Sequence, residues 1–272
     1  MSLSTLDPPL VTLTTDFGAR DTYVGVMKGV MLGIAPNLRI VDLAHDIPPQ
    51  DIQTAAYHVS VAAPHFPKGT IHVVVVDPGV GTERRAIVVE TMRALYVAPD
   101  NGVLTWILES ETPRRVVELT DSAYWLDDVS STFHGRDIFA PVAAHIAAGV
   151  PFEQLGQPGA DPMRLPVSLV TRDEDGSIDG QVQHIDHFGN AITNIPRTTV
   201  LEQQGDPADY HVRVAGRDIG SIATTYAGGA EGDPLALFGS AGFLEIAVRA
   251  GDAASQLGLH RGTHVKLIYQ GG

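Results

Sequence analysis

The sequence predicts two domains of different fold class: an α/β domain over residues 1–158 and a smaller all-β, barrel-like domain over residues 166–272. Up to about residue 150, short apolar runs alternate with segments of helical spacing, which is typical of a sheet covered by helices. Beyond residue 166, short extended runs are separated by Gly, Pro and Asp, which is typical of a small barrel or sandwich. Segment 156–164 has two Gly, two Pro and no period, so it is the candidate linker.

The first half carries the clearest periodicity. The β-branched run at 71–76 (IHVVVV) predicts a strand covered on both faces, as in a mostly parallel sheet. A helix over 21–34 is predicted by apolar residues three and four positions apart, Val24, Met27, Met31 and Ile34. The other elements expected here are strands at 11–15, 39–43, 86–90, 95–98 and 115–119, and helices at 51–63, 103–108 and 137–148.

The second half is expected to be almost entirely extended. Its predicted strands are 180–185, 191–195, 211–214, 235–238, 244–248 and 264–268. One short helix is expected at 253–257. The sequence contains no internal repeat and no low-complexity segment.

Composition excludes several functions. The net charge is −14 and no Lys/Arg cluster exceeds a pair, which argues against a nucleic-acid partner. The start of the chain lacks the basic and apolar regions of a signal peptide, and no apolar run approaches the ~18 residues that span a bilayer, so no membrane association is expected. With no cysteine, disulfides and thiolate metal sites are impossible, which fits a cytoplasmic protein.

Three polar clusters follow or flank predicted elements of the first half. Asp16 comes directly after the first strand, where open α/β sheets bind ligands and where a carboxylate can accept both hydroxyls of a ribose. Asp77 follows the most buried strand, and Arg84, seven residues later, can return to the same pocket if the glycine-rich loop folds back. His134 precedes a predicted helix for which Asp137 is a plausible N-cap, so the helix dipole would favour neutral imidazole. Taken alone, the Asp16 cluster is better explained as a turn or helix cap and the His134 cluster as a structural loop, while the Asp77 cluster is equally compatible with a surface turn and an incidental ion pair.

Two further clusters lie in the second half. Segment 186–190 (DHFGN) joins an acid, an aromatic ring and an amide, and segment 239–245 is similar in kind; a hairpin turn is the alternative for the first. The chain has no phosphate-binding glycine motif and no zinc motif. His45 and Asp46 are possible metal ligands, but the prolines after them favour a structured loop, so no metal is expected.

Seven segments in order resemble the SAM hydroxide adenosyltransferase family, which is related to the SAM-dependent fluorinase and chlorinase (SAM is S-adenosyl-L-methionine). The resemblance covers residues 11–269. The segments are TTDFG…DxYVGxMKG (14–29), HDIPP (45–49), VVDPGVGTxRR (75–85), APDNGVL (98–104), TFHGRDIFAP (132–141), IDHFGNAITNIP (185–196) and GSxGFLEIAV (239–248).

The resemblance implies hydrolysis of SAM to adenosine and L-methionine, with SAM as substrate and no cofactor. It implies a homotrimer in which the β-barrel domain completes the SAM site across a subunit interface. It places the catalytic set on Asp77, Arg84 and His134. It places substrate contacts on Asp16, which binds the ribose, on Thr132 and Phe133 beside the reacting carbon, and on Asp186, Phe188, Asn190, Ser240, Glu245 and Val248.

The chain departs from the family pattern at two places, and three other hypotheses of function stay open. The family often has Gly-Asn-Ala-Ala where this chain has Gly-Asp-Ala-Ala at 251–254, which leaves the adenine contacts there open, and Arg85 beside Arg84 leaves the choice of arginine open. The interval from Arg84 to Ala98 has no room for the halogenases' extra loop, and an Asp, an Arg and a His suit water better than a halide. A halogenase-type transfer, an idle SAM or adenosine sensor and a metal-dependent hydrolase are the other hypotheses.

Overall fold

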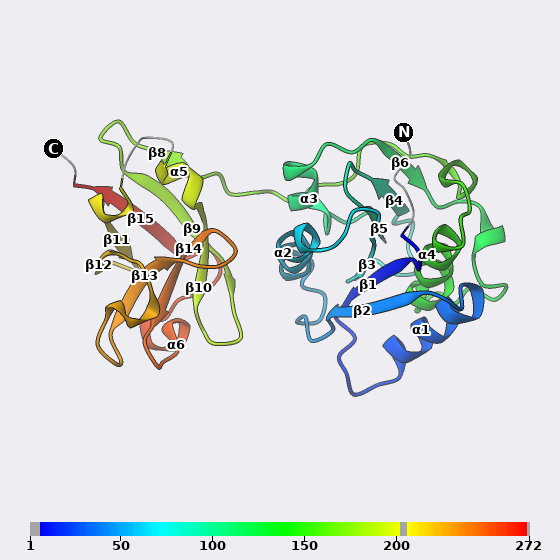
Figure 1. Cartoon of the computed structure of the whole chain (residues 1–272), viewed down its shortest axis with the longest axis horizontal. Helices are drawn as coiled ribbons and strands as arrows, with labels where there is room; N and C mark the ends of the chain where they lie inside the picture. The colour runs from blue at the N-terminus through cyan, green and yellow to red at the C-terminus, as the bar shows by residue number, and fades with distance from the viewer. Residues whose placement is uncertain (1–5, 202–205, 271–272) are drawn as a thin grey trace. The chain divides into compact units, whose positions relative to one another are not determined.

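The computed structural model describes residues 6–201 and 206–270. The chain forms two compact units whose boundary falls between Leu165 and Pro166 (Figure 1). The first is an α/β unit and the second is a β-barrel, so both predicted fold classes are confirmed.

Within residues 6–165 the strands form a seven-stranded mixed sheet in the order β2-β1-β3-β5-β4-β6-β7. Parallel pairing joins β2 to β1, β1 to β3 and β3 to β5, while β4, β6 and β7 are added antiparallel. The antiparallel half follows from the four-residue connection 91–94, which is too short for the crossover that a parallel neighbour needs. The strands are β1 (Leu10–Thr15), β2 (Arg39–Ala44), β3 (Ile71–Val75), β4 (Ala86–Glu90), β5 (Leu95–Pro99), β6 (Arg115–Glu118) and β7 (Gln157–Pro158).

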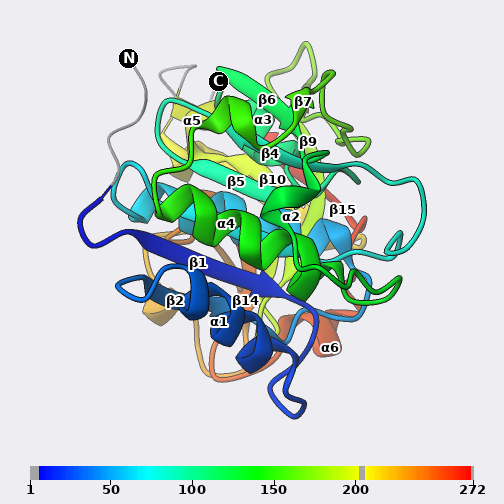
Figure 2. The same cartoon turned by 90° about the vertical axis from the view of Figure 1, so that its right-hand side faces the viewer.

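Helices cover both faces of this sheet. On one face, α1 (Tyr23–Ile34) and α4 (Ala140–Ala147) pack together (Figure 2). They cover every second side chain of β1 and β3, namely Val11, Leu13, Ile71, Val73 and Val75. On the other, α2 (Ile52–Ala62) and α3 (Thr105–Ser110) pack together over side chains of β3, β4 and β5. Coverage on both faces explains why β3 is buried along its whole length and rich in β-branched residues.

The helix expected at 137–148 begins differently. A π-helical turn, η3 (Gly135–Phe139), precedes α4, and His134 occupies the position before that turn. The predicted N-cap role of Asp137 is wrong, because its fully buried side chain lies inside the turn. There it accepts a hydrogen bond from the backbone N–H of Ser130 (2.9 Å) and pairs with Arg136. These partners compensate the buried negative charge of Asp137, so the side chain needs no helix N-terminus to stabilise it.

The second unit is a seven-stranded barrel within residues 166–201 and 206–270. Its strands follow the order β9-β10-β14-β13-β12-β11-β15, and the pairing of β9 with both β10 and β15 closes the sheet; β8 adds to β9. The elements are β8 (Thr171–Arg172), β9 (Ile178–Ile185), β10 (Ala191–Pro196), α5 (Arg197–Leu201), β11 (Tyr210–Val214), β12 (Arg217–Ala223), β13 (Pro234–Phe238), β14 (Phe243–Val248), α6 (Ala253–Leu257) and β15 (His264–Tyr269).

Three of these elements were not predicted: β8, β12 and α5. Strand β12 has the sequence RDIGSIA, whose two large apolar residues do not alternate regularly with polar ones, so it lacks the two-residue period of a strand. In the described part of the chain, no helix combines the length and apolar character needed to cross a bilayer.

Candidate active site

A pocket of about 370 Å³ lies in the first unit at the carboxyl ends of β1 and β3. These strands are parallel neighbours, with Thr15 opposite Val75, so the residues that follow them emerge side by side. This is the edge at which α/β sheets bind ligands. The pocket is lined by Asp16, Phe17, Tyr23, Pro49, Gln50, Val75, Asp77, Pro78, Val80, Thr132, Phe133, His134 and Gly135.

Asp77 and Arg84 form a bidentate ion pair beside this pocket. The Nε and Nη2 atoms of Arg84 donate to the two carboxylate oxygens of Asp77 at 3.1 and 2.6 Å. The side chains are only 7% and 5% exposed, so the pair is shielded from solvent. The loop after β3 therefore does fold back to return the arginine to the aspartate.

Gly81 makes this fold-back possible. Its φ is +75°, and a Cβ there would lie 2.2 Å from the backbone oxygen of Ser131. A side chain would force the loop away from the segment that carries Thr132 and His134.

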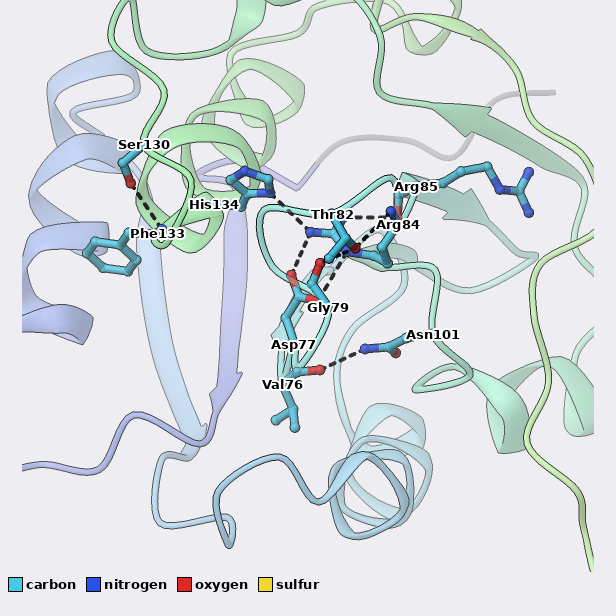
Figure 3. Close-up of polar contacts among 10 residues, drawn as sticks. All are labelled: Val76, Asp77, Gly79, Thr82, Arg84, Arg85, Asn101, Ser130, Phe133 and His134. Atoms are coloured by element: carbon cyan, nitrogen blue, oxygen red, sulfur yellow. Dashed lines mark hydrogen bonds and ion pairs between the residues drawn. The ribbon is translucent and has the colours of Figure 1, made fainter.

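His134 joins the same network. Its Nδ1 lies 3.1 Å from Nη2 of Arg84, so Asp77, Arg84 and His134 are linked in a row (Figure 3). A guanidinium can only donate, so Nδ1 accepts, and the neutral ring carries its proton on Nε2. Burial, followed by the positive charge of Arg84, lowers the pKa of His134 below its ordinary value. The imidazole is neutral, as expected, although these causes differ from the helix dipole invoked from the sequence.

The neighbouring arginine has a different partner. Arg85 pairs with the buried carboxylate of Asp100, while Arg84 is the one that contacts both Asp77 and His134. Figure 3 shows the Arg85 side chain directed away from this network.

Aromatic rings form another wall of the pocket. The ring of Phe133 meets those of Phe17 and Tyr23 edge to face at centroid distances of 5.7 and 5.2 Å. Thr132 lies beside them on the lining. Tyr23 had no assigned role in the sequence, since a tyrosine at a helix start has many structural explanations.

Asp16 also lines the pocket. Its Oδ2 accepts a 2.7 Å hydrogen bond from the backbone N–H of Gln50. Gln50 was missed because a backbone donor carries no residue-type pattern, and Pro49, which also lines the pocket, had no assigned role.

The expected residues at 186–190 form the loop between β9 and β10. Asp186 Oδ1 accepts from the backbone N–H groups of Phe188 (2.9 Å) and Asn190 (2.8 Å), and its Oδ2 accepts from Nδ2 of Asn190 (3.0 Å). The alternative interpretation of this segment, a hairpin turn, thus describes the geometry of the loop. Phe188 stands out from it with 73% of its surface exposed.

The other three expected residues lie along or beside β14. Glu245 is buried and accepts from the hydroxyl of Tyr226 at 2.5 Å; burial and then the nearby Asp186 raise its pKa, although the tyrosine hydrogen bond opposes them. The side chain of Val248 belongs to the barrel core. Ser240 lies in the turn before β14, and the loop 186–190 leads into β10, which pairs with β14.

Within the described residues, no group of three or more His, Asp or Glu side chains could hold a metal ion. Fold and pocket together define a protein with an α/β unit that carries a pocket at its sheet edge and a β-barrel unit.

Comparison with known proteins specifies the family. Models of the SAM hydroxide adenosyltransferase N-terminal and C-terminal domains match residues 11–156 and 180–266. The chain belongs to the SAM hydroxide adenosyltransferase family.

Its relatives span almost its full length. The (R)-S-adenosyl-L-methionine hydrolase of Thermus thermophilus is 42% identical, with 95% of this chain and 99% of that protein covered. The protein of the same name from Methanocaldococcus jannaschii is 35% identical, with 96% of each covered. A fluorinase of an Actinoplanes species is 28% identical over 94% of this chain and 96% of its own. A crystal structure of an uncharacterized conserved protein from Thermotoga maritima superimposes with a TM-score of 0.89 at 37% identity, covering 94% of this chain and 99% of that one.

Proposed function

We propose that this protein hydrolyses (R)-S-adenosyl-L-methionine by attack of water on C5′, giving adenosine and L-methionine. The observation that carries the proposal is the shielded Asp77–Arg84–His134 network beside a pocket at the sheet edge. The full-length relatives that bear the hydrolase name support the same reaction.

The pocket offers recognition for the adenosyl part of SAM. The carboxylate of Asp16 would accept the ribose hydroxyls, and Thr132 and Phe133 would line the space around C5′. Asp186, Phe188, Asn190, Ser240, Glu245 and Val248 would contact the adenine and methionine parts from the barrel of a neighbouring subunit. Since the Val248 side chain is in the barrel core, its backbone would make the contact.

The reaction needs little help at the leaving group. Attack forms the O–C5′ bond, and the electron pair of the C5′–S bond moves to the sulfonium, which leaves as the neutral thioether of methionine. One proton of the water is released. The catalytic task is therefore to hold a weak nucleophile in line with the C–S bond, which can lower the barrier by about 7–11 kcal/mol in well-oriented cases.

His134 and Arg84 would hold this water. With Nδ1 accepting from Arg84, His134 presents Nε2–H, so it would donate a hydrogen bond to the oxygen of the nucleophile instead of removing its proton. The charge of Arg84 would favour hydroxide character as attack proceeds. Asp77, bonded to two nitrogens of Arg84, would keep the guanidinium in place.

The proposal includes a metal-independent reaction and a homotrimeric assembly. Turnover should be unchanged by a chelator such as EDTA, since the three proposed groups supply the charge and the hydrogen bonds. Light scattering coupled to size-exclusion chromatography should give three times the mass of the 272-residue chain. A chelator-sensitive rate would contradict the first expectation, and a monomer that is active at high dilution would contradict the second.

Incubation with SAM in oxygen-18 water, with and without chloride, tests the reaction by mass spectrometry. Adenosine labelled at the 5′-oxygen together with unlabelled methionine would establish water attack at C5′. A 5′-halogenated nucleoside would instead establish a halogenase-type transfer. SAM recovered unchanged from a stoichiometric complex would indicate a sensor.

A further inference from the structure

Segment 45–50 (HDIPPQ) has no role in the proposed chemistry, yet it contacts the Asp16 turn at several points. Gly18 donates its backbone N–H to the carbonyl of His45 at 2.8 Å. The hydroxyl of Thr15 lies 2.9 Å from Nδ1 of His45. The residues on both sides of Asp16 are therefore held by one histidine.

That histidine is itself anchored. Its Nε2 lies 2.9 Å from Oδ1 of Asp42, whose other oxygen accepts from Lys28 at 2.6 Å. Burial alone would raise the pKa of Asp42, but the hydrogen bonds from Lys28 and His45 outweigh burial and lower it, so the carboxylate stays ionised. A proton on Nε2 would face the carboxylate of Asp42, and this tautomer leaves Nδ1 to accept from Thr15.

The far end of the segment reaches the carboxylate directly. Gln50 donates its backbone N–H to Oδ2 of Asp16 at 2.7 Å, and it does so with a φ of +67°. Residues with a side chain seldom adopt this left-handed conformation. Among the described residues, only two other non-glycine positions share it, Ala215 and Ala250.

The middle of the segment fixes this strained end. Ile47 is 3% exposed and belongs to the core beneath α2, and Pro48 and Pro49 fix their own φ angles directly before Gln50. Gln50 is then held two residues before the start of α2, whose N-cap is Asp51. A rare conformation retained at a pocket wall is a mark of function.

We propose that segment 45–50 is a clamp for Asp16, and that Gln50 is a positioning residue for ribose recognition. The backbone N–H of Gln50 occupies Oδ2 of Asp16 and turns Oδ1 toward the hydroxyls of the ribose. This inference rests on the proposed binding of an adenosyl group, and it adds the residues that orient the acceptor.

Three variants test the clamp. Gln50→Gly keeps the N–H and tolerates a positive φ, whereas Gln50→Val disfavours that φ and should displace the N–H. Ala215→Val is the matched control, because it places the same β-branched side chain at another positive-φ position, in the turn between β11 and β12. Calorimetry would measure binding of adenosine and of 2′,3′-dideoxyadenosine, so the test does not depend on turnover.

We expect Gln50→Val to weaken adenosine binding by about tenfold, the effect of one hydrogen bond to a charged group. It should leave dideoxyadenosine binding unchanged, while Gln50→Gly and Ala215→Val should retain the wild-type preference for adenosine. If Gln50→Val fails to fold, His45→Ala, which removes the anchor on Thr15, should reduce the same preference.

Equal weakening for both nucleosides would overturn the clamp, and so would a wild-type protein that binds both equally. A wild-type protein that prefers adenosine, loses this preference in Gln50→Val and does not cleave SAM would retain the clamp and contradict the proposed hydrolysis.

Discussion

The two units each carry an acidic side chain with several hydrogen bonds, but these bonds have different origins. In the first unit, Asp77 is bonded to an arginine seven residues away, which in turn contacts His134 from a third segment. In the second unit, Asp186 receives all three of its hydrogen bonds from Phe188 and Asn190, within its own loop.

A polar motif can join separate elements at a site, or it can hold the shape of its own loop. The Asp77 network joins separate elements beside a pocket and leaves Nε2 of His134 for a ligand, so its loss should affect chemistry. The Asp186 bonds hold a hairpin loop in shape and present the exposed ring of Phe188, so their loss should affect folding and affinity first.

Replacing the member of the network that faces the pocket should have the largest effect. His134→Ala removes the donor to the nucleophile and should lower kcat by about 10²–10³-fold, the usual cost of losing one preorganised hydrogen-bond donor. SAM affinity should change little. Steady-state kinetics and calorimetric binding of SAM check both values, and an unchanged kcat with weakened binding would refute the role.

The adjacent residues Arg84 and Arg85 have different partners, so their replacement should affect kcat differently. Arg84→Lys keeps the charge but cannot bond both oxygens of Asp77 and Nδ1 of His134, so kcat should fall by about 10–100-fold. Arg85→Lys is the control, since Arg85 pairs with Asp100 outside the network, and its kcat should stay near wild type. Equal losses in the two variants would mean that Arg84 acts only through stability.

The pH profile tests the same network without mutation. Burial and Arg84 lower the pKa of His134, so the neutral ring persists below the ordinary histidine range and the rate should be flat through neutral pH. Below that lowered pKa, protonated Nδ1 would oppose the N–H of Arg84, and kcat should fall about tenfold per pH unit. A profile that declines already from pH 8 downward would contradict a neutral resting state.

The smallest catalytic effect is expected in the barrel. Asp186→Ala leaves three N–H donors of its loop without their acceptor and should lower the free energy of unfolding by about 1–3 kcal/mol. Asp186→Asn, which keeps the acceptor for both backbone N–H groups, should lose less. Thermal or urea unfolding measures this, and kcat at saturating SAM should change less than in His134→Ala. A kcat loss as large as that of His134→Ala would remove the contrast between the units.

The sequence by itself determined the fold classes and the candidate residues near the strand ends. Helix α1 and strand β3 follow apolar spacings that remain local to the chain, and the family motifs carry Asp16, Asp77, Arg84 and His134 in order. Local periodicity predicts such elements because burial of one face or both faces imposes it.

Only the tertiary structure decided which groups meet. It distinguished Arg84 from Arg85, placed Asp137 inside a π-helical turn and gave Nδ1 of His134 an arginine partner. It also showed that Gln50 holds Asp16 through its backbone, 34 positions away along the chain. The physical reason is that a hydrogen bond between distant segments depends on how those segments pack, whereas a backbone donor is the same in every residue type except proline and leaves no mark in the sequence.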